Sequence, residues 1–373
     1  MPSTHRTGLT FLVQRDALMH TRTEPIDLDT PPAPGSARLA IECFAFTANN
    51  ITYAVFGDSM HYWRFFPAQS MDRPWGCIPV WGFASVEASA VDGFAVGERI
   101  YGYWPMASHA TVRPVALSAH GFTDGSAHRA ELPPVYNRYQ RVATRADIAQ
   151  DGAYAVLRPL FATAWLIDDF FAEANDFGAR QLLLSSASSK TALATAFCLQ
   201  QRQGAPRVVG LTSASRLDYV QSLGVYDEVL AYDALDRIGA DEVVAYIDFA
   251  GDAPLRRAVH ERFASTLAFS SSIGGTHHDA LGGTRGLPGP KPELFFAPAQ
   301  MQKRSAPPPQ GLGRDGLMAG IDATWSAFVA RAMQPGAAWI EIESRRGSEA
   351  VREAYLQTLH GQGDPRRALM LAL

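Results

Sequence analysis

The sequence is poor in cysteine and has no long apolar run. Its three cysteines, Cys43, Cys77 and Cys198, are far apart and odd in number, which argues against a disulfide framework. No stretch approaches the roughly 20 apolar residues that a membrane-spanning helix needs. The opening residues also lack the apolar core of a signal peptide. These absences predict a cytoplasmic protein.

An excess of positive charge is also missing. Lys and Arg number 33 against 37 Asp and Glu, which gives a formal net charge of −4, and no polybasic run occurs. Nucleic-acid and membrane-surface binding depend on such basic clusters, so we expect neither a nucleic acid nor a membrane as partner. The 373 residues fit two domains, since one domain commonly has roughly 100–200 residues.

One loop is serine-rich where the fingerprint of dinucleotide-binding folds, G-x-G-x-x-G, is glycine-rich, so it does not match that fingerprint. The apolar run 181–184 leads into Ser-Ser-Ala-Ser-Ser at 185–189, and helix-forming residues follow. A strand, tight turn and helix direct backbone N–H groups and a helix dipole toward one point, which suits a phosphate. Alternatively, a buried strand simply runs into a core helix. The predicted phosphate ligands are Ser186, Ser188, Ser189 and Lys190.

A second apolar run, 207–211, ends in Thr-Ser-Ala-Ser-Arg. In a dinucleotide fold the end of this strand meets the adenosine ribose, where an acid binds a free 2′-hydroxyl and an Arg accommodates a 2′-phosphate. The nearest acid, Asp218, falls inside the expected next helix. We therefore expect Thr212, Ser213 and Arg216 to bind the 2′-phosphate of NADPH, in preference to NADH. Alternatively, Arg216 is a solvated surface charge.

Short strands punctuated by Gly dominate the first part of the chain, at 8–15, 38–46, 78–86 and 96–104, which suggests a small β-barrel with sharp corners. Beyond about residue 162, strands alternate with helices, a pattern that predicts a parallel, doubly wound sheet. The expected strands of that sheet are 181–186, 207–211, 227–231, 244–248 and 265–270.

The two patterns predict an α/β protein with two domains. The barrel domain is expected at 1–162 and 334–373, since the last strands should return to it, and the nucleotide-binding domain at 163–333. Helices are expected at 164–177, just before the serine-rich loop, and at 314–333.

A dense aromatic segment, Tyr-Trp-Arg-Phe-Phe-Pro, occupies residues 62–67. It does not have the pattern of a regular core strand. Large aromatic side chains are common in ligand clefts, so Tyr62, Trp63 and Phe66 are predicted to line a pocket for a small apolar or aromatic substrate. Alternatively, they fill a loop against the domain.

The order of these elements resembles that of the medium-chain dehydrogenase/reductase superfamily. Residues 96–102, Val-Gly-Glu-Arg-Ile-Tyr-Gly, are similar to its Val-Gly-Asp-Arg-Val-x-Gly segment, and Leu-Gly-Val at 223–225 to its Leu-Gly-Ala-Asp stretch. Asn-Asn-Ile-Thr-Tyr at 49–53 and the serine-rich loop resemble the DUF2855 branch. The resemblance implies a GroES-like barrel and a Rossmann-type domain, with a homodimer as a common assembly.

Zinc-dependent members of that superfamily carry an early Cys, a His-Glu pair and a cluster of cysteines. Here Cys43 lacks the matching Gly-x-Asp context, and no cysteine cluster is present. The only His-Glu pair, His260-Glu261, falls in the nucleotide-binding domain. We therefore predict that no metal is bound.

Without a metal, the chain is similar to the quinone and enone reductases. Tyr53 lies where these carry a Tyr four residues before a loop Gly, here Gly57. With an ordinary pKa near 10, a phenol stays protonated and donates to a developing enolate. Ile51 departs from the Asp common in those relatives, so Asn49 and Asn50 are assigned to the nicotinamide ribose or substrate carbonyl. Alternatively, Tyr53 only packs the barrel.

These features together predict an NADPH-dependent reductase that transfers hydride to an activated C=C or a quinone in a cleft between the domains. Tyr53 and Asn50 are the predicted catalytic residues. The alternatives are a carbonyl reductase, an NADPH-binding redox sensor without turnover, and a fold that has lost nucleotide binding.

Overall fold

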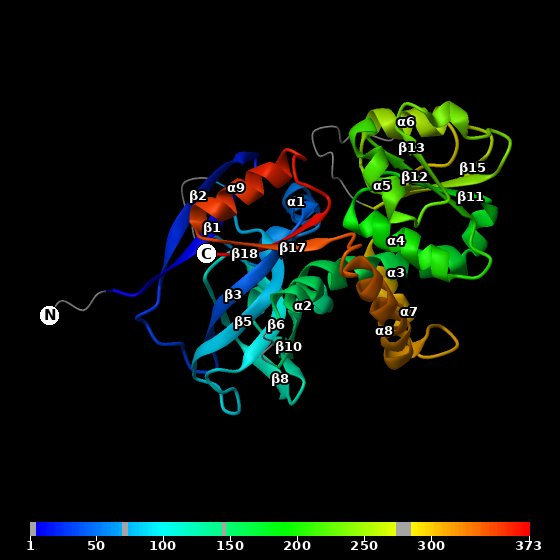
Figure 1. Cartoon of the computed structure of the whole chain (residues 1–373). Coiled ribbons are helices and arrows are strands. Elements are labelled where there is room, and N and C mark those ends of the chain that lie inside the picture. Colours follow the sequence, from blue (N-terminus) through cyan, green and yellow to red (C-terminus); the bar gives the residue numbers. More distant parts are fainter. Residues whose placement is uncertain (1–4, 69–73, 144–146, 274–284) are drawn as a thin grey trace. The chain divides into compact units, whose positions relative to one another are not determined.

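The computed structural model describes residues 5–68, 74–143, 147–273 and 285–373. The chain forms two compact units (Figure 1). We call Met1–Val156 with Glu341–Leu373 the barrel unit and Leu157–Ile340 the sheet unit. The predicted fold class, a GroES-like β-barrel with a doubly wound parallel sheet, is confirmed.

The sheet unit contains six parallel strands in the order β13-β12-β11-β14-β15-β16. The strand order reverses between β11 and β14, and in such sheets ligands bind outside the carboxyl ends of the strands at this point. The serine-rich loop follows β11 directly, so the fold places it at the reversal. The strands are β11 (Gln181–Leu184), β12 (Arg207–Thr212), β13 (Glu228–Ala231), β14 (Val244–Asp248), β15 (Leu267–Ser272) and β16 (Glu293–Leu294).

Three features of the sheet unit differ from the prediction. The two-residue strand β16 was not predicted. Helix α3 spans Arg158–Glu173 rather than 164–177. It ends before a left-handed turn in which Asp176 has a φ of 50° and Phe177 a φ of 54°.

That left-handed turn is held by its neighbours. Arg202 binds the Asp176 carboxylate through two hydrogen bonds of 3.0 and 2.6 Å. The Phe177 ring stacks on Phe269 with 3.8 Å between ring centroids. Such contacts stabilise a conformation that non-glycine residues rarely adopt, and none of them is visible in the local sequence.

The helices of the sheet unit lie against one another and against the sheet. Helix α3 packs against α4, α7 and α8 (Figure 1), and its aromatic Phe161 contacts Phe328 of α8 with 5.0 Å between ring centroids. The helices after α3 are α4 (Lys190–Gln201), α5 (Leu217–Leu223), α6 (Ala253–Arg262), α7 (Ala297–Arg304) and α8 (Gly313–Ala332).

The barrel unit contains two sheets. A three-stranded sheet has the order β2-β1-β4, and the larger one has the order β17-β18-β3-β5-β6-β10-β9-β8, with β7 paired to β3. The sequence did not predict β2, whose side chains are exposed or half-buried throughout. The strands are β1 (Thr7–Gln14), β2 (Ala17–Asp27), β3 (Ala37–Phe46), β4 (Trp75–Gly76), β5 (Pro79–Ser89), β6 (Arg99–Pro105), β7 (His109–Val112), β8 (Pro114–Ser118), β9 (Gly121–Asp124), β10 (Arg138–Arg141), β17 (Glu341–Arg346) and β18 (Arg367–Ala372).

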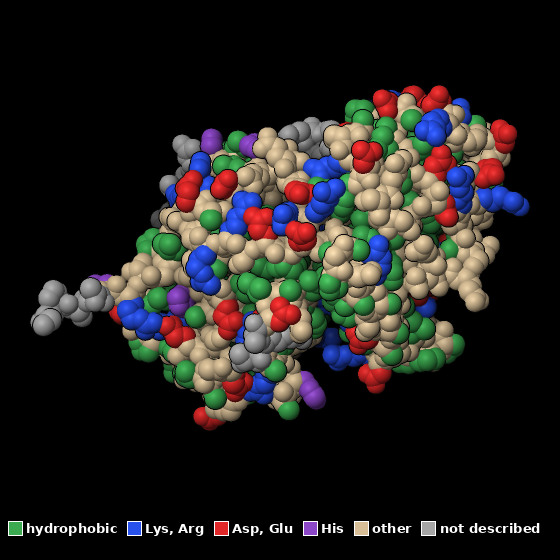
Figure 2. Space-filling view, viewed as in Figure 1, with side chains coloured by type: hydrophobic (Ala, Val, Ile, Leu, Met, Phe, Trp, Pro, Cys, Tyr) green, Lys and Arg blue, Asp and Glu red, His purple; other side chains and the backbone are tan. Residues whose placement is uncertain are grey.

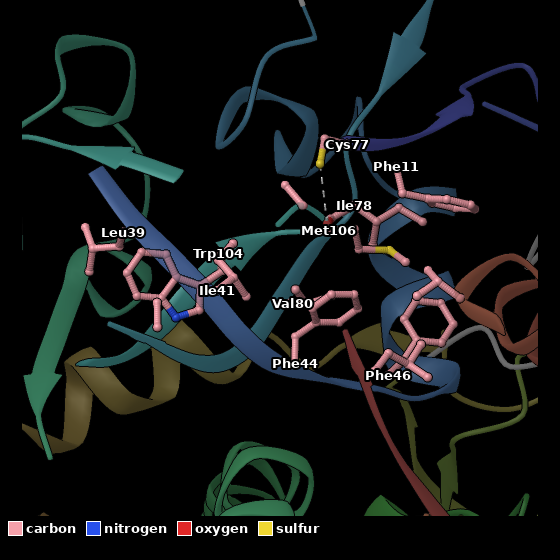
Figure 3. Close-up of a cluster of buried hydrophobic side chains, with 14 of the residues drawn as sticks. Phe11, Leu39, Ile41, Phe44, Phe46, Cys77, Ile78, Val80, Trp104 and Met106 are labelled. Atoms are coloured by element: carbon pink, nitrogen blue, oxygen red, sulfur yellow. Dashed lines mark hydrogen bonds between the residues drawn. The ribbon is translucent and has the colours of Figure 1, made fainter. Parts of the chain in front are cut away.

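The C-terminal segment is part of the barrel unit. Strand β18 pairs with β3 (Figure 1), and helix α9 (Ser348–Leu359) packs Tyr355 against Phe11 with 5.6 Å between ring centroids. Figure 3 shows the core that these elements share, with Phe11, Phe44, Val80 and Trp104 drawn among its side chains. All four are at most 1% exposed, as in a well-packed hydrophobic core.

The surface charge and the apolar character of the helices agree with the sequence, which has no polybasic run and no long apolar run. On the face shown in Figure 2, acidic and basic side chains are intermixed rather than gathered by sign. Among the described residues, no helix combines the length and the apolar character that crossing a membrane requires.

Candidate functional site

The serine-rich loop makes a tight turn between β11 and α4. Ser186 has a φ of 51°, and the Ser189 backbone N–H donates to the Ser186 carbonyl at 2.7 Å. The Ser189 side chain caps the helix by accepting from the Ala192 N–H at 3.3 Å. Ser188, Ser189 and Lys190 are half-buried, and Ser186 is buried. The loop therefore leads directly to the N-terminus of a 12-residue helix, where an anion is favoured.

Ser185, the first residue of the loop, has a structural role. It is fully buried, donates to Asp248 Oδ1 at 2.9 Å and accepts from the Ala250 N–H at 3.0 Å. Asp248 also binds Arg256 at 2.9 Å. These contacts fix the loop to the end of β14, across the point where the strand order reverses.

Gly210 lets the loop approach β12 closely. A Cβ atom at Gly210 would lie 2.8 Å from the Tyr226 ring and 3.0 Å from the Ala187 Cβ. The Tyr226 hydroxyl donates to the Ala187 carbonyl at 2.8 Å. This glycine thus serves the close packing that a glycine of the usual fingerprint provides, although it lies on the neighbouring strand.

The end of β12 carries hydroxyl groups and an Arg, and no carboxylate. Thr212 is buried, Ser213 and Arg216 are half-buried, and the Ser213 hydroxyl lies 3.2 Å from that of Ser215. Asp218 is exposed in the first turn of α5. The structure brings Thr212, Ser213 and Arg216 to one strand end, and this set of groups suits a phosphate better than a free ribose hydroxyl.

Tyr232 joins this site, and the sequence reasoning missed it. Its backbone N–H donates to the Thr212 carbonyl at 2.9 Å. Burial raises the pKa of Tyr232 to about 12, while the Ser186 backbone N–H and the Arg216 charge act in the opposite direction. Its hydroxyl thus lies near both the serine-rich loop and Arg216. The sequence signal was a Tyr directly after the third strand of the sheet.

A second candidate site lies in the barrel unit, where α1 (Ala48–Val55) presents Tyr53. The Tyr53 ring lies 4.4 Å from the Tyr62 ring and 5.9 Å from the Tyr103 ring, measured between centroids. Tyr136 lies 4.6 Å from Tyr103. We call Tyr53, Tyr62, Tyr103 and Tyr136 the tyrosine cluster. The sequence pointed to the first two of these and missed the other two.

Burial keeps Tyr53 protonated. It raises the pKa of Tyr53 above the ordinary value, while hydrogen-bonding groups of Asn49, Trp81 and Tyr136 lower it by less. A neutral phenol can donate a hydrogen bond to a substrate oxygen at physiological pH.

Asn50, a predicted catalytic residue, has a structural task in the barrel unit. Its Oδ1 accepts from the Thr47 N–H at 2.8 Å, and its Nδ2 donates to the Pro79 carbonyl at 2.9 Å. Thr47 is the N-cap of α1, and Asn50 completes the capping box. The amide beside Tyr53 is that of half-buried Asn49, one turn earlier on the helix.

The three aromatic residues predicted to line a substrate pocket do not all lie in the same place. Tyr62 is in the tyrosine cluster, and half-buried Phe66 lies 6.3 Å from the Tyr103 ring. Trp63 is 3% exposed and belongs to the main core, where a side chain at Gly57 or Gly76 would overlap its indole ring. We therefore assign Trp63 to the core of the barrel unit and not to the substrate.

The described residues contain no group of three or more His, Cys, Asp or Glu side chains placed to hold a metal ion. Both ring nitrogens of His260 are engaged, Nδ1 with the Pro288 carbonyl at 2.8 Å and Nε2 with Ser270 Oγ at 3.0 Å. Burial raises the pKa of the Cys43 thiol to about 11.

Comparison with known proteins places the chain among proteins of related fold. The family model "Protein of unknown function (DUF2855)" matches residues 44–364. No curated protein matches the chain.

Solved structures resemble it over nearly their whole length. CurA from Vibrio vulnificus in complex with NADPH has a TM-score of 0.57 at 14% identity, covering 97% of this chain and 98% of CurA. TarJ from S. aureus in complex with NADPH has a TM-score of 0.54 at 9% identity, covering 99% and 100%. CurK enoyl reductase has a TM-score of 0.53 at 12% identity, covering 99% and 100%. At these identities the likeness establishes a shared fold.

Proposed function

The chain belongs to the DUF2855 family, and we propose that it is an NADPH-dependent reductase of an activated C=C or a quinone. The proposal rests first on the groups gathered at the carboxyl ends of the neighbouring strands β11, β12 and β13: the serine-rich loop, Thr212, Arg216 and Tyr232. Two proteins of the same fold, CurA and TarJ, were crystallised with NADPH, and a third is an enoyl reductase.

The residues at these strand ends fit this cofactor. The loop residues are small, and the loop packs closely on β12 at Gly210, so the loop backbone lies at the N-terminus of α4. This arrangement suits a pyrophosphate. When bound, NADPH would supply a hydride for the reduction. The residues that would hold its phosphates are Ser186, Ser188, Ser189 and Lys190, with Thr212, Ser213, Arg216 and Tyr232 at the 2′-phosphate.

Tyr53 would act on the substrate oxygen. Hydride addition at the carbon β to a carbonyl moves the π-electron pair onto the oxygen, and a proton from water then completes the saturated product. A protonated phenol stabilises the charge that develops on that oxygen. Burial of Tyr53 maintains this protonation state. The Asn49 amide lies beside the Tyr53 hydroxyl and would bind the same substrate oxygen.

Titration of the protein with NADPH and NADH, followed by tryptophan fluorescence, tests cofactor binding. We expect NADPH to bind at least about tenfold more tightly, a difference of about 1.4 kcal/mol. Arg216→Ala should remove most of that preference. Arg207→Ala is the matched control. Arg207 is the first residue of β12, at the end of the strand opposite to Thr212, and it pairs with Glu228. Binding of neither nucleotide would refute the proposal.

Turnover separates a reductase from an NADPH-binding sensor. A reductase consumes NADPH when quinones or enones are supplied, and Tyr53→Phe lowers that rate with little loss of NADPH affinity. A sensor binds NADPH without consuming it. Comparison of enones with simple ketones also separates the enone reductase from a carbonyl reductase.

A further inference from the structure

The loop between β9 and β10 is anchored so that it carries Tyr136 into the tyrosine cluster. Two charged residues of this segment, Asp124 and Arg129, are buried. Arg129 is 1% exposed and donates to Asp124 Oδ2 at 2.7 Å and to the Tyr136 carbonyl at 2.8 Å. Asn137 Nδ2 donates back to the Arg129 carbonyl at 3.0 Å. These bonds fix the backbone on both sides of the Tyr136 side chain.

The four phenol side chains of the cluster come together from four separate elements. Tyr53 comes from α1, Tyr62 from the 3-10 turn Tyr62–Arg64, Tyr103 from β6 and Tyr136 from the 3-10 turn Pro134–Asn137. The hydroxyls of Tyr62 and Tyr136 lie 3.4 Å apart. A hydrogen-bonding interaction with Tyr136 also acts on the Tyr53 hydroxyl, and the Tyr103 hydroxyl influences it without a direct hydrogen bond. The hydroxyl groups therefore converge, although their backbones are far apart in sequence.

The Tyr103 hydroxyl is buried without a partner. Tyr103 is fully buried, and in the described part of the chain its oxygen has no hydrogen-bond partner. Buried hydroxyls are nearly always hydrogen-bonded, since leaving one unpaired costs free energy. An acceptor brought in by a ligand would satisfy this donor.

The four phenols of the tyrosine cluster are neutral hydrogen-bond donors. Burial raises the pKa of all four phenols, so each is neutral and can donate. The nearby Arg129 charge lowers the pKa of Tyr103 by a smaller amount. The Asp124 carboxylate is already paired with that guanidinium. Several neutral donors directed at one oxygen stabilise the negative charge that develops on it.

We infer that the tyrosine cluster is an oxyanion site, in which Tyr53, Tyr103 and Tyr136 together bind the oxygen of an enolate or a hydroquinone monoanion. This inference rests on the proposed function and deepens it, since it extends the oxygen-binding role from one phenol to several. Half-buried Trp81 lies 5.0 Å from Tyr103 and 6.1 Å from Tyr136, between ring centroids. Together with Phe66 it borders the cluster with flat apolar surface, which suits a conjugated or aromatic ligand.

A nitrophenol titration without cofactor tests the site, because the ionised form of the probe absorbs differently from its neutral form. An oxyanion site binds the phenolate in preference to the phenol, so the pKa of the bound probe falls. Tyr103→Phe and Tyr136→Phe should each weaken phenolate binding by at least about tenfold, as expected for a hydrogen bond to a charged group. Both substitutions retain the ring and its packing.

Tyr355→Phe provides the matched control. Tyr355 is buried in the same unit, and its hydroxyl donates to the Leu18 carbonyl, outside the cluster. It should leave phenolate binding unchanged. Thermal unfolding checks that each variant is folded, and if Tyr103→Phe is not folded at the assay temperature, Tyr136→Phe decides the question. Preference for neutral nitrophenol, or unchanged phenolate binding in folded Tyr136→Phe, overturns the inference.

The same titration separates this inference from the proposed function. A protein that reduces quinones with NADPH but shows no tyrosine-dependent phenolate binding keeps the reductase function and loses the oxyanion site. A protein that binds phenolate through these tyrosines but neither binds nor consumes NADPH keeps the site and loses the reductase function.

Discussion

Asn49 and Asn50 are adjacent in sequence and differ in what their side chains contact. Asn50→Ala removes the partner of the Thr47 N–H and leaves the Pro79 carbonyl unpaired. We expect it to lower the free energy of unfolding by about 2 kcal/mol without changing NADPH affinity. Urea unfolding and the nucleotide titration measure the two effects.

Asn49→Ala is the matched variant of that test. Asn49 is half-buried beside Tyr53, so its loss should leave the unfolding free energy nearly unchanged and slow NADPH oxidation by about tenfold, as for one hydrogen bond to a developing charge. If Asn50→Ala proved as stable as the wild type but inactive, Asn50 would regain the catalytic role.

The residues of the candidate sites were predictable only where they lie close to a local pattern. Tyr53 and Tyr62 are near the family-like segment and the aromatic run, and the serine-rich loop has its own composition. Tyr103 is one of several aromatics in an ordinary buried strand. Tyr136 and Tyr232 reach their sites through tertiary contacts with Arg129 and Thr212, for which no short sequence pattern exists.

At the level of elements, the serine-rich loop and strand β12 pack tightly against each other at Gly210. We expect Gly210→Ala to push the Tyr226 ring and Ala187 apart, because its Cβ would lie 2.8 and 3.0 Å from them. The substitution should lower the free energy of unfolding by about 1–3 kcal/mol, as overpacking does, and should also weaken NADPH binding. Urea unfolding and fluorescence titration measure both quantities.

Gly239→Ala controls for the loss of a glycine in the same unit. Gly239 is exposed, and an added Cβ would meet nothing within 4 Å. Its effect should stay within about 0.5 kcal/mol, with NADPH affinity unchanged. Weaker NADPH binding in both variants would show that the effect at Gly210 is not specific to the loop.

Most strands of the sheet unit were predictable because each is a short apolar run between breakers, and their order along the chain gives a parallel sheet. The misses have physical causes. Strand β2 buries no residue fully, so it lacks an alternating pattern. Helix α3 begins six residues before the predicted start, after a π-helical turn at 153–157, which depends on packing rather than on local propensity.

At the scale of the whole molecule, the chain leaves the barrel unit and returns to it. The pattern of expected strands and helices changes twice along the chain, near residues 162 and 334, and this suffices to expect two units. It could not show that β18 pairs with β3, in the register Leu371 with Phe44. Pairing across more than 300 residues leaves no local pattern. Nor could the sequence show that β17 and β18 run parallel in a sheet that is otherwise antiparallel.

Global stability in acid should depend on His260, which is fully buried. The Pro288 carbonyl can only accept, so Nδ1 carries the proton and Nε2 accepts from Ser270. Burial lowers the pKa of His260, the Arg256 charge lowers it further, and the Pro288 and Asp248 contacts oppose them. The folded protein therefore holds this imidazole neutral at a pH where an unfolded chain protonates it.

The sign of the pH dependence follows from that difference. Below the unfolded pKa of about 6.5 the unfolded state binds the extra proton, so stability is complete above that pH and falls as the pH drops toward the lower folded pKa, by up to about 1.4 kcal/mol per pH unit. Urea unfolding at about pH 7.5 and about pH 5.5 measures how much unfolding free energy each protein loses in acid. The loss should be smaller in His260→Gln than in the wild type, and the Gln amide can still bind Pro288 and Ser270. The control His120→Gln, at an exposed histidine, should lose as much unfolding free energy between the two pH values as the wild type. An equal loss in all three proteins would mean that His260 does not link acid to unfolding, and that carboxylates carry the effect.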